Sequence, residues 1–194
     1  MPPQNAQTHT PQEAIQAILD GNARYRAGRP TANNAPETLF ELESGQSPFA
    51  GILRCADSRV APEIVFDQPL GNLFSCAVAG NLPTSEVVAS LEYAVLALGT
   101  PAIVVMGHTG CGAVGAAIGR QQGADPLPGS LPALIEQVEL PADDEDPVLH
   151  NARQSAKRLV ERSKVLRDRV ESGELAVRAG VLDISTGVFS LIPA

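Results

Sequence analysis

The run AIVVM at residues 102–106 is the feature that most limits what this chain can fold into. Five consecutive apolar residues are typical of a parallel strand that is covered on both faces. The run leads into GHTGCGAVG, residues 107–115, whose small residues predict a tight turn and then a helix that reaches Ile118. A strand buried on both faces needs helices on each side, so we expect an α/β fold.

The rest of the chain alternates between strand and helix patterns. Thr10, Pro11 and Glu13 are typical of a helix start, and the apolar spacing that follows predicts a helix before Gly21. Gly and Pro dominate residues 119–132, which are expected to form a loop. The other predicted elements are strands at 49–53 and 72–79, short helical pieces within 39–43 and 61–65, a helix from Thr84 or Ser85 to Leu98, a helix face from Leu149 to Val170, and two final strands around a turn at 185–187. This order predicts a mainly parallel central sheet flanked by helices, with an N-terminal helical arm and a C-terminal hairpin or edge strand.

Length and composition agree with one globular domain. The chain has 194 residues, of which 44% are hydrophobic and 19% are charged, so it resembles neither a disordered nor a membrane protein. We expect a single domain over residues 1–194. Within it, residues 1–9 are expected to be a flexible arm, residues 10–48 a helical arm and loop, and residues 49–194 the α/β core that carries any metal site.

Charge and hydropathy exclude several kinds of partner. The chain has 22 Asp+Glu and 14 Lys+Arg, a net charge of −8, which argues against binding to nucleic acid or to an anionic membrane. No apolar run reaches the roughly 20 residues that a membrane-spanning helix needs. The first residues also lack the basic and apolar regions of a secretory signal. We therefore expect a cytoplasmic protein whose three cysteines are thiols or metal ligands.

Two cysteines and one histidine are placed where they could bind a metal. Cys55 follows one predicted strand and His108 follows another, and open α/β sheets place their ligands at such strand ends. Cys111 lies three residues after His108, so a tight turn can bring both side chains to one point. Two thiolates and one imidazole match a catalytic zinc site with a fourth position open for water. Spacing alone equally allows buried inert thiols and a hydrogen-bonded core histidine, and Cys76 is expected to be such a core residue.

A carboxylate and a guanidinium accompany the first of these cysteines. Asp57 and Arg59 lie two and four residues after Cys55. A guanidinium can hold a carboxylate through two parallel hydrogen bonds, and without such a partner Asp57 could itself occupy the open metal position. The same spacing also fits a surface ion pair, which contributes only about 0–1 kcal/mol.

The glycines around Cys111 allow a second interpretation. Gly110, Gly112 and Gly115 match the G-x-G-x-x-G pattern of dinucleotide-binding folds, and they follow a predicted strand and open a helix. That fold also needs a second strand with an acidic residue at its end, which residues 119–132 cannot supply because they are rich in Gly and Pro. The glycines are better explained as room for a tight turn beside a metal.

Four segments together resemble the β-class carbonic anhydrases. They are RCADSRVAPEIVFD, GNLFSCAVAGN, SLEYAVLALGTPAIVVMGHTGCGAV and VLDISTG, and the resemblance runs from about residue 14 to residue 192. It implies that Cys55, His108 and Cys111 bind one zinc ion per chain and that Asp57 and Arg59 form a catalytic dyad. It also implies a zinc lyase, carbonate dehydratase, in which zinc-bound hydroxide converts CO₂ into bicarbonate and a proton.

The resemblance further places three residues around the substrate. Gln46, Phe74 and Tyr93 fall at the Gln, Phe and Tyr positions of the plant-like branch, whose resting zinc carries water. The other branch has a Trp in a bicarbonate pocket and a closed state in which the dyad aspartate binds zinc. This chain has no Trp, and Ile52 stands at that position. We therefore expect the open branch, with Asp57 a zinc ligand only if a closed state forms.

Family members assemble as dimers or larger multiples, so the resemblance implies a homo-oligomer whose sites lie at the subunit interface. Two departures from the family pattern are Asn72 in GNLF, which alters a turn, and Ala77, which replaces a common basic residue near the interface. Two other functions stay open. One is hydrolysis of carbonyl sulfide or carbon disulfide on the same scaffold, and the other is a non-catalytic zinc-binding assembly or regulatory module.

Overall fold

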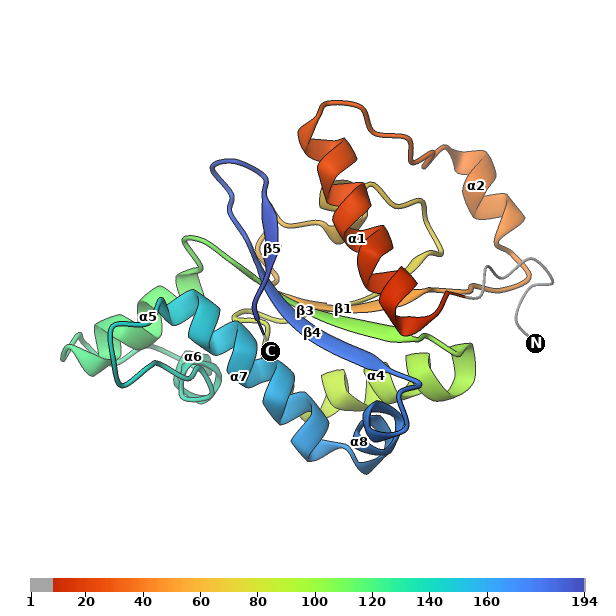
Figure 1. Ribbon diagram of the computed structural model, residues 1–194. Helices are drawn as coiled ribbons and strands as arrows, with labels where there is room; N and C mark the ends of the chain where they lie inside the picture. The colour runs from red at the N-terminus through yellow and green to blue at the C-terminus, as the bar shows by residue number, and fades with distance from the viewer. Residues whose placement is uncertain (1–8, 194) are drawn as a thin grey trace.

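A sheet of five strands forms the centre of the computed structural model, which describes residues 9–193 (Figure 1). The strands are β1 (Ala50–Arg54), β2 (Leu73–Ala77), β3 (Ala102–His108), β4 (Ala176–Leu182) and β5 (Phe189–Leu191). Their order is β2-β1-β3-β4-β5, and only β5, which pairs with β4, is antiparallel to its neighbour. The expected mainly parallel sheet with a C-terminal hairpin is therefore confirmed.

Helices cover both faces of this sheet. In chain order they are α1 (Pro11–Arg26), α2 (Pro36–Glu41), α3 (Pro62–Val65), α4 (Ser85–Leu98), α5 (Gly112–Gln121), α6 (Leu131–Ile135), α7 (Pro147–Arg162) and α8 (Lys164–Glu171). Helix α1 lies over one face, and α4, α7 and α8 lie over the other (Figure 1). Among residues 9–193, the structure has no helix with the length and apolar character that a membrane crossing requires.

Alternate side chains of the two central strands enter two separate cores. Ile52 and Val104 pack around Ile18 of α1, whereas Leu53 and Val105 pack against α4 and α8. Every residue of β3 is buried, as its apolar run predicts. Because β1 and β3 are parallel neighbours, their carboxyl ends lie side by side.

The N-terminal helix is longer than its sequence pattern predicts. Helix α1 passes through Gly21 and ends at Arg26. A Cβ atom at Gly21 would lie 1.8 Å from the carbonyl oxygen of Phe66, so this glycine serves close packing rather than helix termination. The flexible arm expected at residues 1–9 lies outside the described residues except for His9, whose ring centroid is 4.9 Å from that of Phe49.

The helix face predicted from Leu149 to Val170 belongs to two helices. Ser163 has extended backbone (φ −121°, ψ 112°) and separates α7 from α8. Its hydroxyl accepts a hydrogen bond from the Leu166 N–H and donates one to the Glu92 carboxylate, so a contact with α4 fixes the break. The loop expected at 119–132 is also shorter, because α5 extends into it and α6 begins within it.

Candidate metal centre

The ends of two neighbouring strands bring the three predicted metal ligands together. Cys55 directly follows β1, His108 is the last residue of β3, and Cys111 immediately precedes α5. Their sulfur and nitrogen ligand atoms all lie within 4.8 Å of one another, and the two sulfurs are 3.9 Å apart. All three side chains are buried, and His108 is buried completely.

The hydrogen bonding of His108 leaves one ring nitrogen for a metal. Nδ1 lies 3.1 Å from the carbonyl oxygen of Thr109, which can only accept, so Nδ1 carries the proton. Nε2 is buried and has no hydrogen-bond partner among residues 9–193. Such an unsatisfied nitrogen costs about 1–3 kcal/mol, and coordination to a metal would remove that cost. Two thiols and this nitrogen therefore fit a zinc ion.

The two cysteine thiols differ in acidity because they interact with each other. The hydrogen bond from Cys111 is the main cause that lowers the pKa of Cys55 to about 4, and the bond from the Gly80 N–H adds to it against the effect of burial. The same pairing, together with burial, raises the pKa of Cys111. Since a metal binds thiolates, its binding at this cluster would release the Cys111 proton.

The carboxylate of Asp57 lies beside the cluster and is held by Arg59. The Arg59 side chain donates from Nε to Oδ1 at 2.9 Å and from Nη2 to Oδ2 at 2.7 Å, and its backbone N–H donates to Oδ1 at 3.0 Å. These bonds keep the pKa of Asp57 well below its usual range. Oδ2 is 4.0 Å from the His108 Nε2, so the carboxylate borders the side of the imidazole that faces the cluster.

The three residues expected around the substrate lie away from this cluster in the same chain. Phe74 is paired with Gly51, four residues before Cys55, so about 13 Å of strand separates their levels in the sheet. Tyr93 on α4 contacts Phe74, with ring centroids 6.2 Å apart. Gln46 is exposed in the segment that precedes β1. One chain therefore does not bring these side chains to its own metal ligands.

The two departures from the family pattern lie outside the ligand set. The Asn72 side chain donates to the Gln68 side chain at 3.3 Å in the turn before β2. Ala77 is paired with Arg54 on the neighbouring strand, and the Arg54 guanidinium donates to the carbonyl of Cys55 at 2.8 Å. A basic side chain is thus present on β1, next to the position where β2 lacks one.

Two residues that the sequence pattern does not single out belong to the surroundings of the cluster. Gly80 contacts a ligand directly, and Asn151 contacts Gly80. The backbone N–H of Gly80 donates to the Cys55 sulfur at 3.4 Å. Asn151, a completely buried residue of α7, donates to the Gly80 carbonyl at 2.9 Å. The sequence feature that could have identified Asn151 is its position beside the apolar face of a predicted helix, where a polar side chain would be buried.

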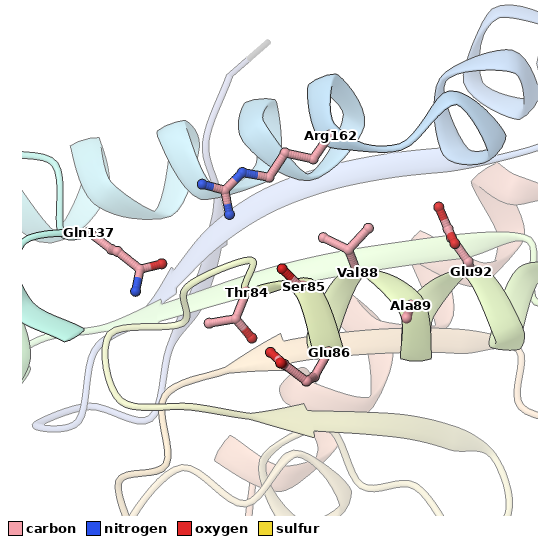
Figure 2. A pocket seen from close by; sticks show the side chains of 8 residues that line it. All are labelled: Thr84, Ser85, Glu86, Val88, Ala89, Glu92, Gln137 and Arg162. Atoms are coloured by element: carbon pink, nitrogen blue, oxygen red, sulfur yellow. The ribbon is translucent and has the colours of Figure 1, made fainter. Parts of the chain in front are cut away.

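A separate pocket of about 710 Å³ lies between the first turns of α4 and the end of α7 (Figure 2). It is lined by Thr84, Ser85, Glu86, Val88, Ala89, Glu92, Gln137 and Arg162. The Arg162 guanidinium in its wall already donates to the Pro83 carbonyl. The lining contains none of the predicted zinc ligands, so this hollow is not the metal centre.

Comparison with known sequences agrees with the geometry of the cluster. The family model for carbonic anhydrase matches residues 50–189. Carbonic anhydrase 2 of Mycobacterium tuberculosis is 38% identical over 178 residues, which cover 86% of this chain and 86% of the relative. The carbonic anhydrase of Mycolicibacterium smegmatis is 41% identical over 129 residues, which cover 66% of this chain and 63% of the relative.

Comparison with solved structures gives the same result for the fold. The β-carbonic anhydrase CafA of Aspergillus fumigatus superimposes with a TM-score of 0.71 at 25% identity, covering 92% of this chain and 90% of that one. A tetrameric β-carbonic anhydrase of Sordaria macrospora gives a TM-score of 0.69 at 22% identity, covering 93% and 95%. With the family match and the Cys–His–Cys cluster at the strand ends, these similarities show that the chain belongs to the carbonic anhydrase family, in its β class.

Proposed function

We propose that this enzyme catalyses the reversible hydration of CO₂ to bicarbonate and a proton, with one zinc ion held by Cys55, His108 and Cys111. The observation that carries the proposal is the cluster of two thiols and a buried imidazole nitrogen that lacks any other partner among residues 9–193. When bound by these three residues, a zinc ion would lower the pKa of a water molecule and so supply a nucleophile for CO₂.

Asp57 and Arg59 serve this reaction by orientation. Because Arg59 engages both carboxylate oxygens and keeps the pKa of Asp57 low, the carboxylate stays ionised throughout the neutral range. A fixed carboxylate can accept a hydrogen bond from the reacting oxygen and direct that oxygen toward CO₂. The pairing with Arg59 supports an open resting state, in which Asp57 is not a metal ligand.

The substrate wall is supplied by a second copy of the chain. Gln46, Phe74 and Tyr93 lie toward the amino ends of the strands, whereas the ligands lie at the carboxyl ends. Tyr93 is 54% exposed although it is aromatic, which is typical of a surface that another subunit covers. The tetrameric assembly of the Sordaria macrospora relative supports a homo-oligomer, and the exposure of Tyr93 supports sites at the subunit interface.

A reducing compartment suits the cluster. All three cysteines are free thiols, and two of them have sulfurs 3.9 Å apart. An oxidising compartment would favour loss of these thiols, which must stay reduced to bind zinc. The proposal therefore places the enzyme in the cytoplasm.

Metal analysis combined with stopped-flow CO₂ hydration tests the proposal. The purified protein is expected to contain one zinc ion per chain and to hydrate CO₂, and Cys55→Ala is expected to lose both. Cys76→Ala is the matched control, because Cys76 is equally a buried cysteine but packs in the core of the sheet. Full hydration activity in demonstrably zinc-free protein would contradict the proposal.

A parallel assay settles the choice of substrate. Carbonyl sulfide and carbon disulfide are offered to the same preparation under the same conditions as CO₂. We expect CO₂ to be turned over far faster than either sulfur compound. Faster turnover of carbonyl sulfide or carbon disulfide would show that CO₂ is not the preferred substrate, while the proposed zinc site would stand.

A further inference from the structure

We propose that Asn151 is a positioning residue of the metal centre, which acts on the Cys55 sulfur through the backbone of Gly80. The inference rests on the zinc site of the proposed function. It assigns a task to a buried side chain that neither binds the metal nor contacts the substrate.

The hydrogen bonds form a continuous connection from α7 to the sulfur. The Asn151 side chain is completely buried, and its Nδ2 donates to the Gly80 carbonyl at 2.9 Å. The N–H of the same residue, Gly80, donates to the Cys55 sulfur at 3.4 Å. The Asn151 Oδ1 accepts from the Glu139 N–H at 3.3 Å, so the amide plane is fixed from both sides. The N–H and the carbonyl of Gly80 belong to successive peptide groups that meet at its Cα, so the bond from Asn151 anchors this residue and with it the N–H that meets the sulfur.

The surroundings of Gly80 explain why a glycine is needed there. Its φ of +79° lies in the left-handed region, which favours glycine. A Cβ atom at this position would lie 3.2 Å from the Cβ of Ala113 and 3.5 Å from a methyl group of Val138. The backbone can therefore approach the cluster closely, and the bond from Asn151 to the Gly80 carbonyl anchors the residue in that place.

The helix that carries Asn151 is attached to the strand that delivers the histidine ligand. A Cβ atom at Gly107, the residue before His108, would lie 3.1 Å from the Cβ of Ala152 and 3.3 Å from a methyl group of Val148. Helix α7 therefore lies directly against the end of β3. The helix that holds the Gly80 backbone through Asn151 is therefore the same helix that packs against the strand end carrying His108.

A hydrogen bond to a thiolate lowers its electron donation to a metal and fixes the direction of its lone pairs. Partners of this kind outside the ligand set typically change metal affinity or activity by about 10–100-fold. Loss of the Asn151 side chain is therefore expected to make the Cys55 sulfur a stronger but less well oriented donor.

Cobalt(II) substitution gives a direct readout of the sulfur. The Co(II)-loaded wild-type protein is expected to show a thiolate-to-cobalt charge-transfer band in the near ultraviolet. In Asn151→Ala, this band is expected to move to longer wavelength, because a sulfur without its hydrogen bond gives up an electron more easily. Release of zinc to a chelator is expected to become about ten-fold faster.

Two variants of the same helix serve as controls. Ser155→Ala removes another completely buried polar side chain, one turn after Asn151. Leu159→Ala opens a cavity at a completely buried position two turns after it and so reports the effect of general destabilisation. Both controls are expected to keep the band position and the zinc release rate of the wild type.

The outcomes separate this inference from the proposed function. A wild-type protein without a charge-transfer band would contradict the metal site itself. A wild-type band that stays in place in Asn151→Ala, with unchanged zinc release, would overturn the role of Asn151 and leave the site intact. If Asn151→Ala does not fold, Asn151→Ser and hydrogen exchange of the Gly80 amide in the unaltered zinc protein replace it. Rapid exchange of that amide would also overturn the inference.

Discussion

The two groups of residues assigned to the reaction lie toward opposite ends of the parallel strands of the sheet, and they differ in how complete they are within one chain. At the carboxyl ends, Cys55, His108 and Cys111 are buried and converge within one chain. Toward the amino ends, Phe74 and Tyr93 contact each other, and Phe74 is half-buried whereas Tyr93 is 54% exposed. We therefore expect the metal chemistry to be specified by a single chain and the substrate wall to need a neighbour.

This difference shows which substitutions should act within one subunit and which should act between subunits. A change at the carboxyl ends should alter metal content or the chemical step without altering assembly. A change on the surface around Tyr93 should alter assembly while the metal stays bound. Substitutions in each group test this separation.

Replacement of a metal ligand should have the largest effect. His108→Ala removes the buried nitrogen and is expected to reduce both zinc content and CO₂ hydration to background. His150→Ala is a suitable control, since His150 pairs with Glu145 at 2.7 Å and is not part of the cluster. Elemental analysis and stopped-flow assays measure both quantities. Normal zinc content in His108→Ala would show that His108 is not a metal ligand and that the metal binds elsewhere.

Substitution in the dyad should slow the reaction and leave the metal bound. Asp57→Asn removes the charge that Arg59 holds and is expected to lower kcat/KM by about 10²-fold, because the reacting oxygen is no longer oriented. Zinc content and oligomeric state should match those of the wild type. If zinc were lost as well, Asp57 would have to be counted among the ligands.

A charge placed on the wall surface should disrupt assembly. Tyr93→Glu is expected to weaken self-association by about 30-fold, corresponding to about 2 kcal/mol, and to lower activity per chain. Leu131→Glu is the matched control, because Leu131 is an exposed apolar residue of α6, 47% exposed. Analytical ultracentrifugation measures the association. A monomeric Tyr93→Glu protein with full activity would show that one chain suffices.

The smallest effect on metal binding and activity is expected at Asp67, whose carboxylate binds the segment between α1 and α2. Its carboxylate accepts hydrogen bonds from Arg24 and from the backbone N–H groups of Thr31 and Ala32. Burial alone raises the pKa of Asp67, but these bonds outweigh burial and lower it to about 2. Relative to the ordinary value of 3.8, this corresponds to about 2 kcal/mol.

The sign of this contribution fixes its pH dependence. Because the folded-state pKa is lowered, the stabilisation is present above about pH 4 and is lost as the pH falls toward about 2. Asp67→Asn should lower the free energy of unfolding at neutral pH by about 2 kcal/mol in urea titrations, with zinc content unchanged. An equal loss of stability at pH 7 and pH 2 would show that the charge is not responsible.

The parts of the fold that sequence reasoning predicted correctly are those in which one local pattern decides the structure. The apolar run of β3 is buried throughout, and Thr10 with Glu13 forms the expected capping box at the start of α1. Cys55 and His108 were identifiable because each follows such an apolar run with one residue between them. Residues at the ends of parallel strands converge whenever the strands pair.

The features that sequence reasoning missed depend on contacts between distant segments. Gly21 resembles a helix end, yet its role is set by the carbonyl of Phe66. Ser163 lies within a continuous apolar pattern, yet its hydroxyl bonds to Glu92 break the helix there. Asn151 acts on the cluster through the backbone of Gly80, 71 residues away in the chain. None of these partners is visible from local periodicity.

The cluster is held in place by the chain itself. The Thr109 carbonyl orients the imidazole, the Gly80 amide meets the Cys55 sulfur, and strand pairing sets the distance between the ligands. A zinc finger, by contrast, folds only around its metal. This protein is therefore expected to fold first and to take up zinc afterwards. The zinc supply of the cell would then decide how many of its molecules are active, but not how many of them survive.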